Sequence, residues 1–306
     1  MVCAEVVPNP QDERLLAGYG NSGTLAGDGS ALFGDGKQGA GVSSSAQAPL
    51  VQLRDACVRR AGRSILSVGE FSLQEGESVA LLGPNGSGKS TFIGLITREV
   101  HPLHRDEAPV LFRGSSRTPL ADIKKAMGVV SSSMQDQIRV HLPAADIVAG
   151  GLFGSLGVPL RREVTEGQRA QARSTMAALG IADLADRDIL TLSTGQARRV
   201  LIARALVHDP DVLIFDEPCT GLDPAGMYHV RNTMSQLARE GRAVLLVTHY
   251  PEDIVPEMQR LVLVKDGRLV ADGPKKELLT SDVMTRLFDV PLEVVEAHGH
   301  YSIVGA

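Results

Sequence analysis

Tryptophan is absent from the 306-residue sequence, and only three cysteines occur. The thiols of Cys3, Cys57 and Cys219 have neither paired spacing nor the spacing of metal ligands, which excludes a disulfide framework and indicates a reducing compartment. An excess of basic residues is missing too, since the net charge is −5 at pH 7. Because binding to a phosphate backbone requires a basic patch, we expect no nucleic-acid partner.

Long apolar runs are also missing. The longest, residues 147–160, is interrupted by glycines and is shorter than the roughly 20 residues that a membrane-spanning helix needs. The first residues show no basic region followed by an apolar one, and Glu5 and Asp12 argue against a secretory or mitochondrial signal. We therefore expect a cytoplasmic protein that reaches the face of a membrane only through a partner.

Composition divides the chain into three parts. Residues 1–48 are rich in Gly, Ser and Ala, and we expect them to form a disordered tail. Residues 49–290 are expected to form the folded domain, followed by a short C-terminal extension over residues 291–306. Within the folded domain the pattern becomes helical and charged at about 142–192, where residues 161–180 are typical of one amphipathic helix that ends at a glycine.

Several short apolar runs indicate strands. The segment from Ser78 to Leu82 leads into a glycine-rich turn and then into helical spacing. The runs at 212–215 and 243–247 lack polar alternation, as parallel strands covered on both faces do. Two alternating runs meet at Asp266-Gly267, a strong hairpin signal. The pattern predicts an α/β fold.

The glycine-rich turn matches the P-loop, GPNGSGKST, between a predicted strand and a predicted helix. Its backbone N–H groups and the following helix start can hold an anion. The lysine can reach the β- and γ-phosphates of ATP, the serine after it can bind Mg²⁺, and the final threonine is placed for a further phosphate contact. The candidate ATP-binding residues are Gly83, Pro84, Asn85, Gly86, Ser87, Gly88, Lys89, Ser90 and Thr91.

Two carboxylates follow the apolar run VLIF, at the end of a predicted buried strand, where ligands collect in such sheets. Asp216 is the candidate Mg²⁺ ligand, together with Ser90. Glu217 is placed to orient or deprotonate the attacking water. His249 follows the apolar run AVLLVT at another strand end, where it can bond the γ-phosphate and its surroundings. Glu217 and His249 are the candidate catalytic residues.

Upstream of these acids, residues 192–199 read LSTGQARR and resemble the LSGGQ signature of the ATP-binding cassette (ABC) ATPases, with Thr194 at the first glycine. The following VLIARALVHDPDVLIFDEPCTGLDP is similar to the same family, and the resemblance covers about residues 50–303. It implies a P-loop NTPase core with a mostly parallel sheet, an antiparallel β subdomain and an inserted helical subdomain.

The resemblance also implies how such chains work. Two cassettes, identical or different, bind head to tail, and each ATP lies between the P-loop of one and the signature of the other. Ser193, Gly195 and Gln196 would then contact the γ-phosphate across the interface, and Asp223 corresponds to the D-loop aspartate and His249 to the H-loop histidine. Ser193 also reads as the N-cap of the following helix.

The segment 146–157 is similar to importer-type cassettes of the iron-chelate, metal and molybdate kinds, which implies an integral membrane permease as partner. Two positions depart from the family. Ser132 stands where the Q-loop glutamine is expected, with Gln135 or Gln137 as substitutes. No aromatic residue stands near 59–61 to stack on adenine, and Arg60 is the alternative there.

We therefore expect a transporter ATPase subunit. The altered Q-loop keeps open the alternative of an ABC ATPase with a regulatory or assembly role and no membrane partner. A small-molecule kinase would leave the signature unexplained.

Overall fold

The computed structural model describes residues 48–159 and 161–305. The unit described below is Pro49–Ala306. The tail expected over residues 1–48 lies outside the described residues, apart from its last residue, and stays a prediction. In the described part of the chain, no helix combines the length and the apolar character needed to cross a bilayer.

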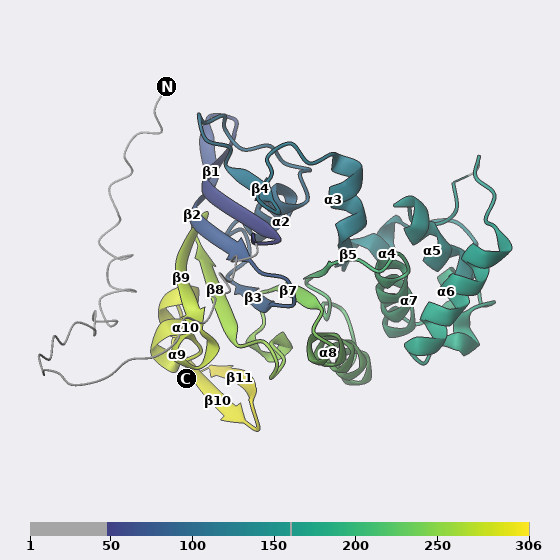
Figure 1. Ribbon diagram of the computed structural model, residues 1–306. Coiled ribbons are helices and arrows are strands. Elements are labelled where there is room, and N and C mark those ends of the chain that lie inside the picture. Colours follow the sequence, from purple (N-terminus) through teal and green to yellow (C-terminus); the bar gives the residue numbers. More distant parts are fainter. Residues whose placement is uncertain (1–47, 160, 306) are drawn as a thin grey trace, which may run out of the picture. The chain divides into compact units, whose positions relative to one another are not determined.

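One nine-stranded sheet, in the order β4-β1-β2-β9-β8-β3-β7-β6-β5, forms the centre of this unit (Figure 1). Strands β8, β3, β7, β6 and β5 run parallel to one another, and β9 is antiparallel to β8. Strands β4, β1 and β2 form an antiparallel part that joins β9 through a single parallel pair. The predicted α/β class, with a mostly parallel core and an antiparallel part, is confirmed. The strands are β1 (Val51–Arg60), β2 (Arg63–Leu73), β3 (Ser78–Leu82), β4 (Val110–Phe112), β5 (Met127–Ser131), β6 (Val212–Asp216), β7 (Ala243–Thr248), β8 (Arg260–Lys265) and β9 (Arg268–Pro274).

The central parallel strands are buried on both faces. All six residues of β7 are buried, as are the first four of β6 and the last four of β3. This burial explains why their sequences are continuous apolar runs without alternation. Since the three strands are parallel neighbours, their carboxyl ends meet at one edge, and the segments that follow them lie together there.

Helices lie beside this sheet, and α5, α6 and α7 contact one another to one side of it (Figure 1). The described α-helices are α2 (Lys89–Ile96), α3 (Leu120–Ala126), α4 (Ser133–Gln137), α5 (Ala144–Gly150), α6 (Glu166–Ala178), α7 (Thr194–Leu206), α8 (Pro224–Arg239), α9 (Lys275–Leu278) and α10 (Ser281–Phe288). Short 3₁₀ turns are η1 (Gly151–Phe153), η2 (Ala182–Leu184), η3 (Ile189–Thr191) and η4 (Pro251–Asp253).

Helix α6 is shorter than the sequence pattern predicted. The helix was expected from residue 161, but it begins at Glu166, because Thr165 forms a capping box with Gln168 and fixes the start there. The helix ends at Ala178, and Gly180 follows with a left-handed φ of 64°. The predicted glycine stop is confirmed, and the predicted start is wrong.

Two hairpins complete the C-terminal part. The β8–β9 hairpin turns at Asp266-Gly267, whose φ angles of 49° and 72° suit a two-residue turn, as predicted. A second hairpin, β10 (Leu292–Ala297) and β11 (His300–Gly305), occupies the expected C-terminal extension, and the sequence analysis did not anticipate it. Its turn is His298-Gly299, again with positive φ at both residues.

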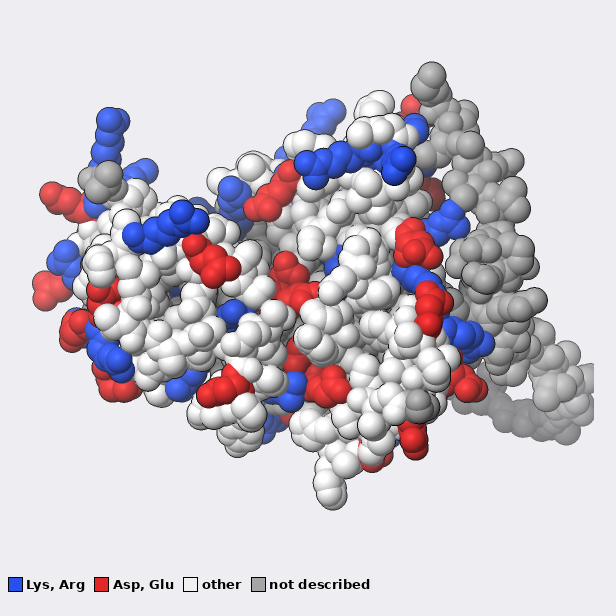
Figure 2. All heavy atoms as spheres, turned by 180° about the vertical axis from the view of Figure 1, so that it is seen from behind, with Lys and Arg blue, Asp and Glu red and all other residues white. Residues whose placement is uncertain are grey.

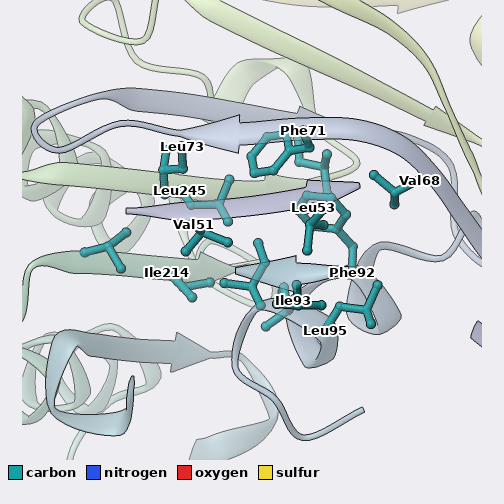
Figure 3. Close-up of a cluster of buried hydrophobic side chains, with 14 of the residues drawn as sticks. Val51, Leu53, Val68, Phe71, Leu73, Phe92, Ile93, Leu95, Ile214 and Leu245 are labelled. Atoms are coloured by element: carbon teal, nitrogen blue, oxygen red, sulfur yellow. The ribbon is translucent and has the colours of Figure 1, made fainter. Parts of the chain in front are cut away.

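A cluster of buried apolar side chains joins the antiparallel strands to α2 (Figure 3). Phe71 of β2 and Phe92 of α2 meet edge to face, with ring centroids 4.9 Å apart. Both rings are buried, and burial of a side chain of this size contributes about 1.5–3 kcal/mol. The cluster therefore fixes the helix that follows the glycine-rich turn.

Charged side chains are spread over the face shown in Figure 2, where those of Lys and Arg are intermixed with those of Asp and Glu. Neither sign covers a continuous region of that face, so no single-sign field extends over it.

Candidate nucleotide-binding site

The glycine-rich turn lies between β3 and α2 in the predicted strand–loop–helix order. Gly86 and Gly88 adopt φ angles of 79° and 103°, which side chains with a Cβ disfavour. At Gly83 a Cβ would lie 2.1 Å from the carbonyl oxygen of Val264, so a glycine is required by space. The turn of the β8–β9 hairpin braces the loop, since Gly267 N donates to Ser87 O at 3.0 Å.

Lys89 opens helix α2 and turns its side chain back into this loop. Its Nζ donates to the carbonyl oxygens of Gly83 and Pro84 at 2.9 and 3.0 Å, and only 6% of the side chain is exposed. Burial lowers the pKa of this amine, and the nearby Glu217 carboxylate opposes the effect. The ammonium is thus held at the loop, next to an acid.

The two candidate acids follow β6. Asp216 is its last residue, and burial, with a further contribution from Glu217, raises its pKa to about 6. Glu217 has a positive φ of 50°, and its carboxylate lies between two cationic or titratable groups: Oε1 is 3.6 Å from Lys89 Nζ and Oε2 is 2.7 Å from His249 Nδ1. The contact with His249 is close but not aligned as a hydrogen bond.

His249 directly follows β7, as expected for a residue at a strand end. Its ring packs on Tyr250 with centroids 3.9 Å apart. The preceding Thr248 accepts a hydrogen bond from Gly83 N through its carbonyl oxygen at 3.3 Å. The structure therefore brings Lys89, Asp216, Glu217 and His249 together at the carboxyl edge of the parallel strands.

The signature residues lie at the start of α7. Ser193 is the N-cap, as predicted: its Oγ accepts from Gln196 N at 3.3 Å, and Gln196 Oε1 accepts from Ser193 N at 3.1 Å. Gly195 faces the first turn of α8, where a Cβ on it would lie 3.3 Å from Gly226 Cα. Asp223 caps α8 by accepting from Gly226 N at 2.7 Å. These residues form a second group, in which the starts of α7 and α8 contact each other.

The two departures from the family pattern have clear positions. Ser132 follows β5, and its N–H donates to the carbonyl of Asp216 at 3.3 Å, so this serine stands beside the candidate Mg²⁺ ligand. Gln135 and Gln137 lie farther along, in α4. Arg60 is the exposed last residue of β1 and pairs with Arg63 across the turn.

Three residues that the sequence analysis did not single out support this site. Arg198 of α7 is 2% exposed and donates to Pro218 O at 2.8 Å, next to Glu217. Asp253 and Arg231 pair at 2.7 Å near the turn that carries His249. The sequence carried a signal that Arg198 is buried, because helical spacing places it on the same face of α7 as the apolar Leu201 and Ala205.

The sequence of the chain is similar to those of known proteins. The family model described as ABC transporter matches residues 66–220. The chain is 32% identical over 249 residues to YlmA of Bacillus subtilis, an uncharacterized ABC transporter ATP-binding protein, covering 80% of this chain and 93% of that one. It is 36% identical over 214 residues to the cobalt import ATP-binding protein CbiO of Rhodobacter capsulatus, covering 69% and 73%.

A solved structure is similar as well. The chain matches cbiO1 from Clostridium perfringens, described as part of the ABC transporter complex cbiONQ, with a TM-score of 0.65 and 26% identity. The match covers 78% of this chain and 94% of that one.

Proposed function

Since the chain belongs to the ABC transporter family of ATP-binding proteins, which hydrolyse ATP, we propose that it is the ATPase subunit of an importer-type transporter and works as a head-to-tail dimer. The single observation that carries this proposal is the position of the Glu217 carboxylate, between Lys89 and His249 at the P-loop. We also propose the expected domain organisation, with a helical subdomain at about 142–192 and a C-terminal extension from residue 291.

The P-loop of the proposed site binds the triphosphate. Backbone N–H groups around Gly86 and Gly88 and the N-terminal end of α2 attract the negative charge. Lys89 is held beside them by two carbonyl oxygens, so its charge is directed to the β- and γ-phosphates. The phosphates would add charge that stabilises the ammonium form of this buried amine.

The residues present fit a magnesium ion. Asp216 has a raised pKa because it is buried beside a second carboxylate, and a divalent cation would relieve that repulsion. Mg²⁺ prefers oxygen ligands and retains waters, which suits one carboxylate, one hydroxyl and the phosphates. Asp216 and Ser90 would hold the ion, which would neutralise charge on the phosphates when bound.

Glu217 acts on the attacking water. Its carboxylate accepts the water proton as the oxygen bonds to the γ-phosphorus, and the bond from that phosphorus to the bridging oxygen of ADP breaks. His249 keeps the carboxylate oriented from one side and Lys89 from the other. The products are ADP and inorganic phosphate.

The signature residues are proposed to act on the ATP of a second chain. Ser193 Oγ already accepts a hydrogen bond from Gln196 N, which leaves its own O–H free to donate to a phosphate oxygen. The N-terminal end of the 13-residue helix α7 favours an anion at the same place. Gly195 and Gln196 complete this surface, and Asp223 lies beside it. Ser193 and Thr194 are exposed on the chain, which supports a role toward a partner cassette.

A cleft of about 960 Å³ separates the sheet from the helical part and supports a permease partner. Its lining combines apolar side chains with charged ones that are basic except for Glu99, so it suits an apolar segment with acidic residues. Met134 lines the cleft and lies two residues after Ser132, which contacts Asp216, so the cleft and the ATP site share one segment. The lining includes Lys124, Met127, Val129, Met134, Phe153 and Arg162.

The alternative is a regulatory or assembly ATPase without a membrane partner, favoured by Ser132 in the Q-loop position. Capture of the tagged chain from solubilised membranes separates the two. Recovery of an integral membrane permease, weakened by Lys124→Glu but not by Lys276→Glu on α9, supports the transporter subunit at the cytoplasmic face. Recovery only from the cytosol, with no permease, would establish the alternative.

A further inference from the structure

We propose that Asp253 is a positioning residue for ATP hydrolysis: together with Arg231 it holds the turn that presents His249 to Glu217. Asp253 ends η4 and is 1% exposed. Its Oδ1 accepts two hydrogen bonds from the Arg231 guanidinium, from Nη2 at 2.7 Å and from Nε at 3.1 Å. A buried carboxylate needs such compensation, because an unpaired charge in the interior is strongly unfavourable.

The second oxygen of Asp253 acts on the residues that flank His249. Asp253 Oδ2 accepts from Thr248 Oγ1 at 3.1 Å, and Thr248 Oγ1 in turn accepts from Tyr250 N at 3.0 Å. The turn is closed by Asp253 N, which donates to Tyr250 O at 3.1 Å. The residue before His249 and the residue after it are thus joined through one hydroxyl and one carboxylate, which fixes the backbone of the histidine.

This turn has little freedom to move without disturbing the reacting groups. Thr248 is the last residue of β7, and its carbonyl accepts from Gly83 N at the start of the P-loop. Glu217 N donates to Val247 O at 2.8 Å on the same strand. The 2.7 Å contact between Glu217 and His249 therefore depends on where the turn after β7 places the imidazole.

The neighbouring thiol adds no charge to the ion pair of Asp253 and Arg231. Cys219 lies against both side chains, and burial raises the pKa of its thiol to about 12, so the thiol stays neutral there. Net stabilisation by a buried ion pair is often close to zero, since desolvation offsets attraction. Orientation of the neighbouring turn is a better explanation for this pair than stability.

Arg231 connects the turn to α8, the helix that begins after Asp223. A displacement of α8 when a second cassette binds would reach His249 through Arg231 and Asp253. The positioning role rests on the proposed parts of Glu217 and His249 in hydrolysis, and this last link rests also on the proposed dimer.

The test compares steady-state ATP hydrolysis by the full chain and its variants, with the folded fraction measured by thermal melting. Asp253→Asn keeps the shape but removes the charge, and Thr248→Val keeps the shape but removes the hydroxyl. We expect each to lower kcat by about 10- to 100-fold while KM for ATP changes less than about twofold, because misplacement of a reacting group affects turnover more than binding. The double variant should lose no more than the larger single loss, since both act through one turn.

Two further variants make the result specific. Arg231→Lys keeps the charge but not the two-pronged donor, and we expect an intermediate kcat. Asp209→Asn removes a carboxylate from an exposed pair with Arg242, and should leave kcat unchanged. If Asp253→Asn folds poorly, Thr248→Val decides alone, since it leaves the ion pair intact. Lower melting temperatures with unchanged kcat in Asp253→Asn and Thr248→Val would overturn the inference, and membrane capture would still test the transporter role independently.

Discussion

Glu217 Oε2 lies 2.7 Å from His249 Nδ1, and the two residues directly follow β6 and β7, which are parallel neighbours. The contact exists because both strands end at the same edge of the sheet. It confines the carboxylate to the side of the P-loop, 3.6 Å from Lys89. An acid in this position can take a proton from a water beside the γ-phosphate.

Glu217→Gln should abolish most ATP turnover and leave ATP binding intact, because the phosphate contacts survive while the water is no longer assisted. We also expect the closed dimer to accumulate with ATP, seen by size-exclusion chromatography. Glu240→Gln, at the exposed end of α8, is the matched control and should hydrolyse ATP normally. A Glu217→Gln protein with undiminished turnover would refute the assignment.

Ser193→Ala should reduce turnover beyond its effect on stability. Loss of an N-cap costs about 1 kcal/mol, and Thr165→Ala removes the same kind of capping box from α6. Both variants should therefore lower the melting temperature by similar amounts. Only Ser193→Ala should reduce ATP hydrolysis, by about tenfold or more, because it also loses a hydrogen bond to a charged phosphate. Equal turnover in the two variants would show that Ser193 does not act on ATP.

Gly83→Ala should destabilise the chain by about 1–3 kcal/mol and weaken nucleotide binding, because the new methyl group meets the Val264 carbonyl at 2.1 Å. The strain would displace the loop that holds the phosphates. Gly69→Ala is the control, since nothing lies within 4 Å of a Cβ there. Chemical denaturation and fluorescent-nucleotide titration give the two measurements, and normal binding by Gly83→Ala would contradict the expected geometry.

Stability without magnesium should depend on pH through Asp216. Its pKa in the folded protein is about 6, above the ordinary value of 3.8, so the folded state binds more protons than the unfolded state in this interval. Stability contributed by this group therefore falls as pH rises from about 4 to about 6. In EDTA at pH 8, Asp216→Asn should raise the free energy of unfolding by on the order of 2 kcal/mol, allowing for screening.

Below about pH 3 the same variant should match the original chain, because the carboxyl is then mostly protonated in both states. Asp211→Asn, an exposed acid before β6, should show no such gain at pH 8. A stability difference for Asp216→Asn that is constant from pH 4 to pH 8 would contradict the raised pKa.

Features specified by neighbouring residues were predictable from sequence. The turn at Asp266-Gly267 and the cap at Ser193 each depend on a few consecutive residues, and both are confirmed. The start of α6 was also within reach, because Thr165 and Gln168 form an S/T-x-x-E/Q pattern that outweighs the apolar period before it. The hairpin after residue 291 had a signal too, in the alternation around His298-Gly299.

Contacts between distant segments were not predictable in the same way. Asp253 and Arg231 are 22 residues apart, and each reads alone as a solvated charge until β7 and α8 bring them together. The position of Ser132 depends on the register of β5 against β6, which brings its N–H to the carbonyl oxygen of Asp216. Such pairs depend on tertiary packing, which one sequence does not specify locally.

The buried guanidinium of Arg198 joins the signature helix to the backbone at Pro218, beside Glu217. In the proposed head-to-tail dimer, these two ends would act on different ATP molecules, so each chain would connect one nucleotide mechanically with the other. Turnover by the dimer should accordingly rise sigmoidally with ATP concentration, and Arg198→Met should make that curve hyperbolic.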